Sequence, residues 1–166
     1  MVLIHNDIEM PFPRSRQDPY PVVQLARLLK RHPKTTVIWA HCGLGRIVRP
    51  VKDQVGMIDR ALSNPELPNL HVDSSWDEVA EYLVATPETV QVAADLIGRH
   101  PDRFLFGTDE VAPSDQAKYL KVYDSTRRSL AKLEPATREK LLKGNYERLF
   151  DEARRRVRAW EKTNPK

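Results

Sequence analysis

The chain has 166 residues, 40% of them hydrophobic and 30% charged, which is enough for one globular domain with its own core over residues 1–166. Its longest apolar runs are strand-sized and stay well below the roughly 18 residues of a membrane-spanning helix, which argues against membrane insertion. The net charge of +4 is compatible with nucleic-acid binding, but much of the basic excess lies at residues 154–158 between Glu152 and Glu161, without interleaved aromatic residues. We interpret this run as a solvated helix face and expect no nucleic-acid partner.

The start of the chain and its single cysteine set two further expectations. Residues 1–4 lack the charged region and the longer apolar stretch of a secretory signal, so we expect a cytoplasmic protein. Cys42 is the only cysteine, which excludes an internal disulfide and a cysteine-based zinc cage. Any metal must therefore be held by histidine, aspartate or glutamate.

Strand-like segments alternate with helical ones along the chain. Short apolar runs bounded by turn residues predict four strands, at residues 1–5, 36–41, 69–74 and 103–108. The spacing of apolar residues predicts helices at residues 21–31, 51–62, 76–99 with a break before Pro87, 114–133, 135–142 and 146–160. This alternation requires parallel strands with right-handed crossovers, so the predicted fold class is α/β.

Two strand-helix units match each other without gaps. Residues 28–33 lead into the strand that ends at His41, and residues 96–101 lead into the strand that ends at Asp109. His41 and Asp109 therefore hold equivalent positions, at the strand ends where α/β folds place ligands and chemistry. His5 closes the first strand in the same way.

These three strand-end residues predict a metal site. If the strands share a similar register, His5, His41 and Asp109 converge at one edge of the sheet. Imidazole nitrogen and carboxylate oxygen suit a divalent ion that activates water, Zn²⁺ first, with Mn²⁺ or Fe²⁺ as alternatives. The competing interpretation of each residue is a rim side chain that only makes hydrogen bonds.

The third predicted strand carries two residues with open roles. Asp73 would reach the same edge, where it either positions substrate or caps the helix that begins near Trp76. His71, in mid-strand, is expected to be packed or hydrogen bonded at the rim.

Five short segments lie at the ends of the predicted strands and in the last predicted helix: Ile-His at 4–5, Trp-Ala-His-Cys-Gly at 39–43, Asn-Leu-His-Val-Asp-Ser at 69–74, Phe-Leu-Phe-Gly-Thr-Asp at 104–109 and Lys-Gly-Asn-Tyr-Glu-Arg-Leu-Phe at 143–150. In order and spacing they resemble the last four strands and the closing helix of amidohydrolase-related metal-dependent hydrolases. The resemblance implies parallel strand-helix repeats equivalent to the C-terminal half, strands five to eight, of a TIM-like β/α barrel, with extra C-terminal helices.

The same resemblance implies roles for particular residues. His5 and Asp109 correspond to metal ligands, and Asp109 would also accept a proton from the metal-bound water. His41 corresponds to a histidine that binds a second metal or helps to position or activate water or substrate. Arg46 would hold a substrate carboxylate, unless it forms a loop salt bridge. The implied reaction is hydrolysis of an amide, ester or lactone bond in a small organic substrate, or a decarboxylation.

One part of the family pattern is absent from the sequence. The family takes two further metal ligands from a His-x-His motif on its first strand, and this chain contains no His-x-His. We therefore expect that the first half of the barrel is supplied by a separate chain, by the remainder of a longer protein, or by a second copy in a homo-oligomer. Two other functions stay open: a catalytically incomplete half-barrel that acts as a subunit or interaction protein, and phosphodiester cleavage as in TatD-like nucleases.

Overall fold

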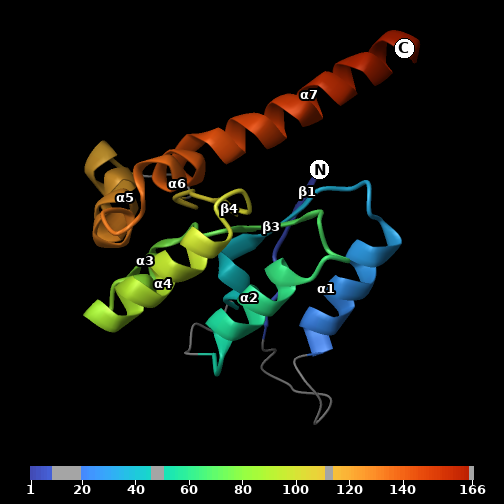
Figure 1. Ribbon diagram of the computed structural model, residues 1–166. Coiled ribbons are helices and arrows are strands. Elements are labelled where there is room, and N and C mark those ends of the chain that lie inside the picture. Colours follow the sequence, from blue (N-terminus) through green and yellow to red (C-terminus); the bar gives the residue numbers. More distant parts are fainter. Residues whose placement is uncertain (9–19, 46–50, 111–113, 165–166) are drawn as a thin grey trace.

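The computed structural model describes residues 1–8, 20–45, 51–110 and 114–164. Within this part of the chain, four strands form one parallel sheet in the order β1-β2-β3-β4 (Figure 1). Each strand therefore pairs with its predecessor in the sequence, as in one half of a β/α barrel, and the predicted α/β class is confirmed. The strands are β1 (Val2–Ile4), β2 (Val37–Trp39), β3 (Leu70–Asp73) and β4 (Phe104–Leu105).

Helices lie between successive strands and follow the last one. The predicted helical segment 76–99 is divided as expected, because Thr86 forms a capping box with Thr89 and Pro87 opens the next helix. The last two predicted helices run on into each other through a π-helical segment. The helical elements are α1 (Tyr20–Arg31), η1 (Ala40–Gly43), α2 (Gln54–Ser63), α3 (Asp77–Leu83), α4 (Pro87–Arg99), α5 (Gln116–Leu130), α6 (Pro135–Glu139), η2 (Lys140–Gly144) and α7 (Asn145–Thr163).

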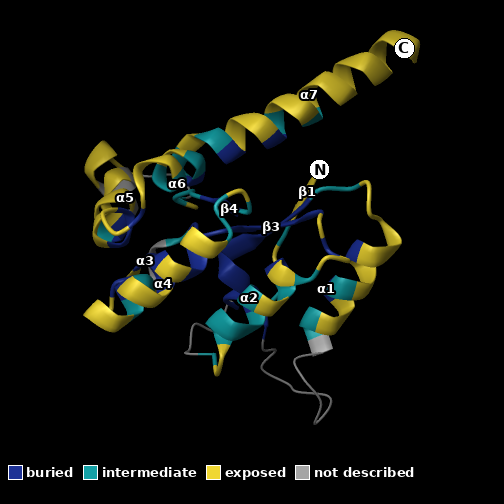
Figure 2. Cartoon of the chain, viewed as in Figure 1, coloured by how far each residue is buried: buried dark blue, intermediate teal, exposed yellow. Residues whose placement is uncertain are grey.

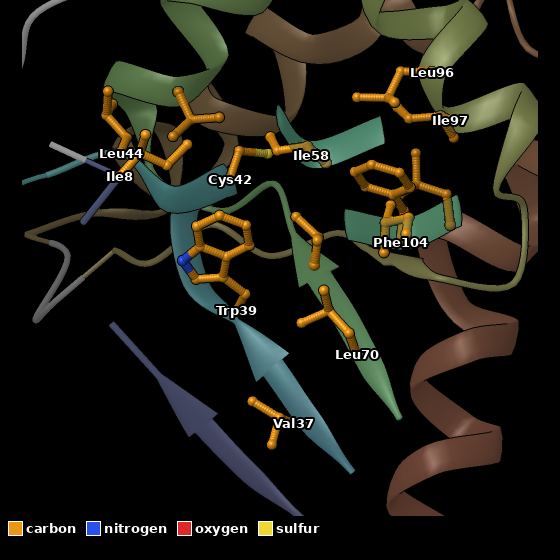
Figure 3. Packing of buried hydrophobic residues seen from close by; sticks show 14 of the residues in the cluster. Ile8, Val37, Trp39, Cys42, Leu44, Ile58, Leu70, Leu96, Ile97 and Phe104 are labelled. Atoms are coloured by element: carbon orange, nitrogen blue, oxygen red, sulfur yellow. The ribbon is translucent and has the colours of Figure 1, made fainter. Parts of the chain in front are cut away.

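The two faces of the sheet pack against different helices. One face carries the main core beneath α1 to α4, and Trp39 and Phe104 are its largest fully buried side chains (Figures 1 and 3). On the other face, Ile38 and Leu105 pack with Leu149 of α7. The sheet is thus a middle layer, and its second face is covered by α7 around β2 and β4.

Apolar side chains remain exposed at β1 and along α7. Leu3 on the edge strand β1 is 59% exposed and Trp160 on α7 is 63% exposed. Figure 2 shows that α7 is buried only near its start, while the rest of the helix projects beyond the sheet. Among the described residues, no helix is long and apolar enough to cross a membrane.

Candidate active site

All four strands end at the same edge of the sheet, because they are parallel and the last residues of neighbouring strands pair with each other or nearly so. Ile4 pairs with Trp39, and Trp39 pairs with Val72. The residues predicted for the site follow at this edge: His5 directly after β1, His41 just beyond β2, Asp73 at the end of β3 and Asp109 just beyond β4.

His41 reaches this edge through a turn that breaks the alternation of the strand. Trp39 points into the core against the helices, and a continued strand would send His41 to that same face. His41 and Cys42 instead adopt left-handed backbone angles, with φ of 58° and 52°. The His41 ring centroid then lies 5.0 Å from that of His5, and its Nε2 lies 3.8 Å from Oδ2 of Asp109. The structure thus places His41 beside both His5 and Asp109.

The side chains of His41 and Asp109, which face each other, differ in exposure. The side chain of Asp109 is 43% exposed, whereas that of His41 is 10% exposed. Asp109 also adopts a left-handed backbone, with φ of 52°. A carboxylate that solvent and ligands can reach therefore faces an imidazole that the protein holds nearly covered.

Asp73 binds the turn that carries His41. Its Oδ1 accepts hydrogen bonds from the backbone N–H of His41 at 3.2 Å, from the backbone N–H of Ser75 at 2.9 Å, and from the Ser75 hydroxyl. The N-cap residue of α3 is Trp76, which makes no side-chain capping hydrogen bond, so the alternative that the Asp/Ser cluster caps this helix stays a prediction. The predicted contact of Asp73 with substrate stays a prediction, and it would have to use Oδ2.

Ser75 and Trp76 complete the surroundings of His41, and the sequence analysis missed both. Ser75 Oγ lies 3.0 Å from His41 Nδ1, and the Trp76 ring lies 5.3 Å from the His41 ring between centroids. The backbone N–H of Trp76 donates to the carbonyl of Thr108 at 3.2 Å, next to Asp109. The available signal was the Asp-Ser-Ser sequence itself, because an aspartate readily accepts from the residue two positions later.

A second carboxylate that sequence reasoning missed lies beside His5. Nε2 of His5 lies 2.7 Å from Oδ1 of Asp7, within hydrogen-bond distance. A Cβ atom on Gly45 would lie 2.8 Å from Asp7 Oδ2, so the glycine leaves the space that Asp7 fills. The signal in the sequence was a carboxylate two residues after a strand-terminal histidine.

The residues at the edge fit a divalent metal in the chemistry of their donors, but the donor set is incomplete. His41 Nε2 and Asp109 Oδ2 face each other beyond hydrogen-bond distance, with the His5 ring beside them. In the described part of the chain, no group of three or more His, Cys, Asp or Glu side chains is close enough to hold a metal. Arg46 lies outside the described residues, so its role in binding a substrate carboxylate stays a prediction.

A mainly apolar cavity of about 410 Å³ lies among α2, α3 and α4, and Cys42 and Ser74 are among its lining residues. Burial raises the pKa of the Cys42 thiol, which donates to the carbonyl of Asp73 at 3.5 Å. The cavity therefore adjoins the back of the His41 turn and contains none of the predicted site residues.

His71 is buried in the sheet, as expected for a packed mid-strand histidine. Burial, with the nearby charges of Arg103 and Arg148, lowers its pKa to about 4. Its Nδ1 has no hydrogen-bond partner among the described residues. His71 is therefore a neutral core side chain near neutral pH.

Two solved structures are similar to this chain. An uncharacterised TIM-barrel protein of Bordetella bronchiseptica superimposes with a TM-score of 0.50 and 25% sequence identity, over 85% of this chain and 43% of that protein. An Agrobacterium tumefaciens protein, solved in its apo form, superimposes with a TM-score of 0.49 and 18% identity, over 80% of this chain and 47% of its own. The chain thus spans less than half the length of these structures.

The sequence also matches a described protein family. No curated protein gives a significant match. The family model described as "Amidohydrolase" matches residues 4–151, from the end of β1 into α7. The match includes every strand end discussed above. The chain therefore belongs to the amidohydrolase family.

Proposed function

We propose that the chain contributes the C-terminal half of the active site of a metal-dependent hydrolase. The observation that supports this proposal most directly is the approach of His41 Nε2 to Asp109 Oδ2, at 3.8 Å, beside His5 at the carboxyl edge of the sheet. Family membership supports hydrolase-type chemistry for a site at this edge. The substrate we propose is a small organic molecule with an amide, ester or lactone bond, and decarboxylation is the alternative reaction.

His5, His41 and Asp109 are the residues proposed to hold a divalent metal. Zn²⁺ is the ion we propose, and the same nitrogen and oxygen donors also accept Mn²⁺ or Fe²⁺. When bound, such a metal supplies a water molecule that ionises near neutral pH. His5 would have to give up its Nε2 contact with Asp7, or use Nδ1, to join the site.

The chain's own side chains then have separate roles. Asp109 is exposed enough to reach a water molecule or substrate and is proposed to accept a proton there. His41 is held nearly covered and is proposed to orient the reacting group or share in proton transfer. Arg46 and Asp73 are proposed to bind the substrate, with Arg46 directed to a carboxylate.

The proposed site needs further ligands from outside the described sheet. The exposed edge strand β1 and the 43% coverage of the Bordetella protein support a barrel that is completed by further strand-helix units. These units would belong to a longer protein, a separate chain or a second copy of this one. Sedimentation velocity tests the last case, since a monodisperse monomer that binds no exposed-core dye excludes it. We further propose that the protein acts in the cytoplasm.

Isothermal titration with Zn²⁺ tests the metal proposal. The metal-stripped chain is expected to bind Zn²⁺ weakly, because only two or three ligands come from one copy. His5→Ala and Asp109→Ala should each weaken binding further, whereas His32→Ala, which alters an exposed histidine at the end of α1, should not. If neither site substitution changes the Zn²⁺ affinity, the proposed site is wrong.

A second candidate function is a non-catalytic half-barrel that acts as a subunit or interaction protein. The absence of a group of three metal-binding side chains among the described residues favours it. Metal content separates the two candidates. Protein purified from zinc-supplemented cells that retains no metal, and takes up none in the titration, supports the non-catalytic function.

A further inference from the structure

His41 is held through both its backbone and its ring by one buried carboxylate. Oδ1 of Asp73 accepts from the His41 backbone N–H, and it also accepts from the Ser75 hydroxyl, whose oxygen contacts His41 Nδ1 at 3.0 Å. All three residues are buried. The protons in this chain of contacts can therefore be assigned by counting donors and acceptors.

The first step is the contact between Ser75 and Asp73. Two backbone N–H groups, of His41 and Ser75, point at Asp73 Oδ1 and have fixed protons. An oxygen that accepts from two N–H groups is the unprotonated oxygen of the carboxyl group. The proton between Asp73 and Ser75 must therefore belong to the serine, so the hydroxyl donates to Oδ1.

The second step is the contact between Ser75 and His41. A serine hydroxyl has one proton, and here the carboxylate takes it. Toward His41 the serine oxygen can only accept, so Nδ1 must carry a hydrogen and donate it across the 3.0 Å contact. In a neutral imidazole the other nitrogen then has the lone pair. We propose that Ser75, backed by Asp73, is a positioning residue that holds neutral His41 as the Nδ1-protonated tautomer.

The consequence concerns the nitrogen that faces the sheet edge. Nε2 is the atom 3.8 Å from Asp109 Oδ2, so its lone pair is presented beside an accessible carboxylate. The opposite tautomer would place an N–H group there, which could neither bind a metal nor accept a proton. The significance of this arrangement for catalysis rests on the proposed function, but the proton assignment does not.

The same segment also contacts the chain that leads to Asp109. The backbone N–H of Trp76 donates to the carbonyl of Thr108, which precedes Asp109. A Cβ atom on Gly107 would lie 3.1 Å from Ser75 Cβ, so the chain before Asp109 runs directly against Ser75. Ser75 therefore lies where it can orient His41 relative to Asp109.

Long-range ¹H–¹⁵N spectroscopy on histidine-labelled, metal-stripped protein tests the tautomer directly. The spectra are recorded at rising pH until the ring nitrogens show the shifts of a neutral imidazole, and His41 is assigned by the signals lost in His41→Gln. In the wild type, Nδ1 should show the shift of a protonated nitrogen and Nε2 that of a lone-pair nitrogen. A wild-type His41 with the reverse pattern overturns the proposal without any variant.

Variants of Ser75 and Ser74 distinguish a positioning role of Ser75 toward His41 from a general effect on packing. Ser75→Ala removes the acceptor and should move His41 toward the Nε2-protonated tautomer, and Ser75→Cys, a weak acceptor of similar shape, should give an intermediate ratio. Ser74→Ala is the matched control, because this serine is equally buried but bonds to the carbonyl of Leu105 and should leave His41 unchanged. Backbone spectra report whether each variant folds. A folded Ser75→Ala protein that keeps the wild-type tautomer overturns the proposal.

The outcome of the tautomer experiment is distinguishable from that of the Zn²⁺ titration. An Nδ1-protonated His41 in a protein that binds no Zn²⁺ supports the positioning role and contradicts the proposed function. Zn²⁺ binding that depends on Asp109, in a metal-free protein whose His41 is Nε2-protonated, contradicts the positioning role and supports the proposed function.

Discussion

Replacing Asn145 with alanine is expected to lower the free energy of unfolding by about 2–3 kcal/mol. This side chain opens α7 and is 1% exposed. Its amide donates to the carbonyls of Pro101 and Phe104, at 2.8 Å each, and so fastens α7 to the chain around β4. Each buried hydrogen bond of this kind contributes about 1 kcal/mol net, and a carbonyl left without its donor adds a desolvation cost.

Urea denaturation followed by circular dichroism measures this loss. On the same scale, the midpoint of thermal unfolding should fall by about 4–12 °C. Asn164→Ala is the matched control, because its amide bonds the Trp160 carbonyl at the exposed end of the same helix, and it should change stability by less than about 0.5 kcal/mol. If Asn145→Ala is as mild as Asn164→Ala, α7 is not held to the sheet in the way described here.

Two further predictions concern backbone strain and pH. Gly43 has a φ of 71°, and a Cβ there would lie 2.5 Å from Trp39 Cζ2, so Gly43→Ala should cost about 2–5 kcal/mol. Gly98→Ala, at an exposed position in α4 with nothing within 4 Å of the added carbon, should instead add about 0.5–1 kcal/mol, and equal effects of the two in urea titrations would contradict the geometry. The His71 pKa of about 4 lies below its ordinary value of 6.5, so the unfolded chain binds the extra proton first and stability falls as the pH drops through this window. Between pH 7.5 and 5 this histidine should account for about 2 kcal/mol of that loss. The slope should flatten in His71→Gln and persist in His32→Gln, and an unchanged slope in the first variant would show that His71 is not buried as described.

Much of the architecture could be predicted from local pattern. Apolar runs bounded by turn residues mark each strand, and Pro87 after Thr86 marks the division of the 76–99 helical segment, because these signals act within a few residues. The predicted strands were too long because the sequence does not show where inter-strand hydrogen bonding stops. β2 ends at Trp39, where the chain turns into η1.

The approach of His41 to Asp109 depends on a turn that the sequence pattern did not reveal. Simple alternation places His41 on the face of Trp39, which packs in the core against the helices. The left-handed turn at His41 and Cys42 returns the ring to His5 and Asp109, and contacts from a neighbouring strand hold that turn. Asp73 accepts from the His41 backbone N–H across a separation of 32 residues, which no local pattern reveals.

The sequence alone therefore determined the order of strands and helices, the strand-end positions of the chemically active side chains and the resemblance to one family. These properties depend on the period of apolar residues and on short motifs. Only the tertiary structure decided which atoms face one another: Nε2 of His41 toward Asp109, Nδ1 toward Ser75, and Asp7 against His5. Such contacts depend on backbone angles and on pairing between distant segments, and these are set when the whole sheet has assembled.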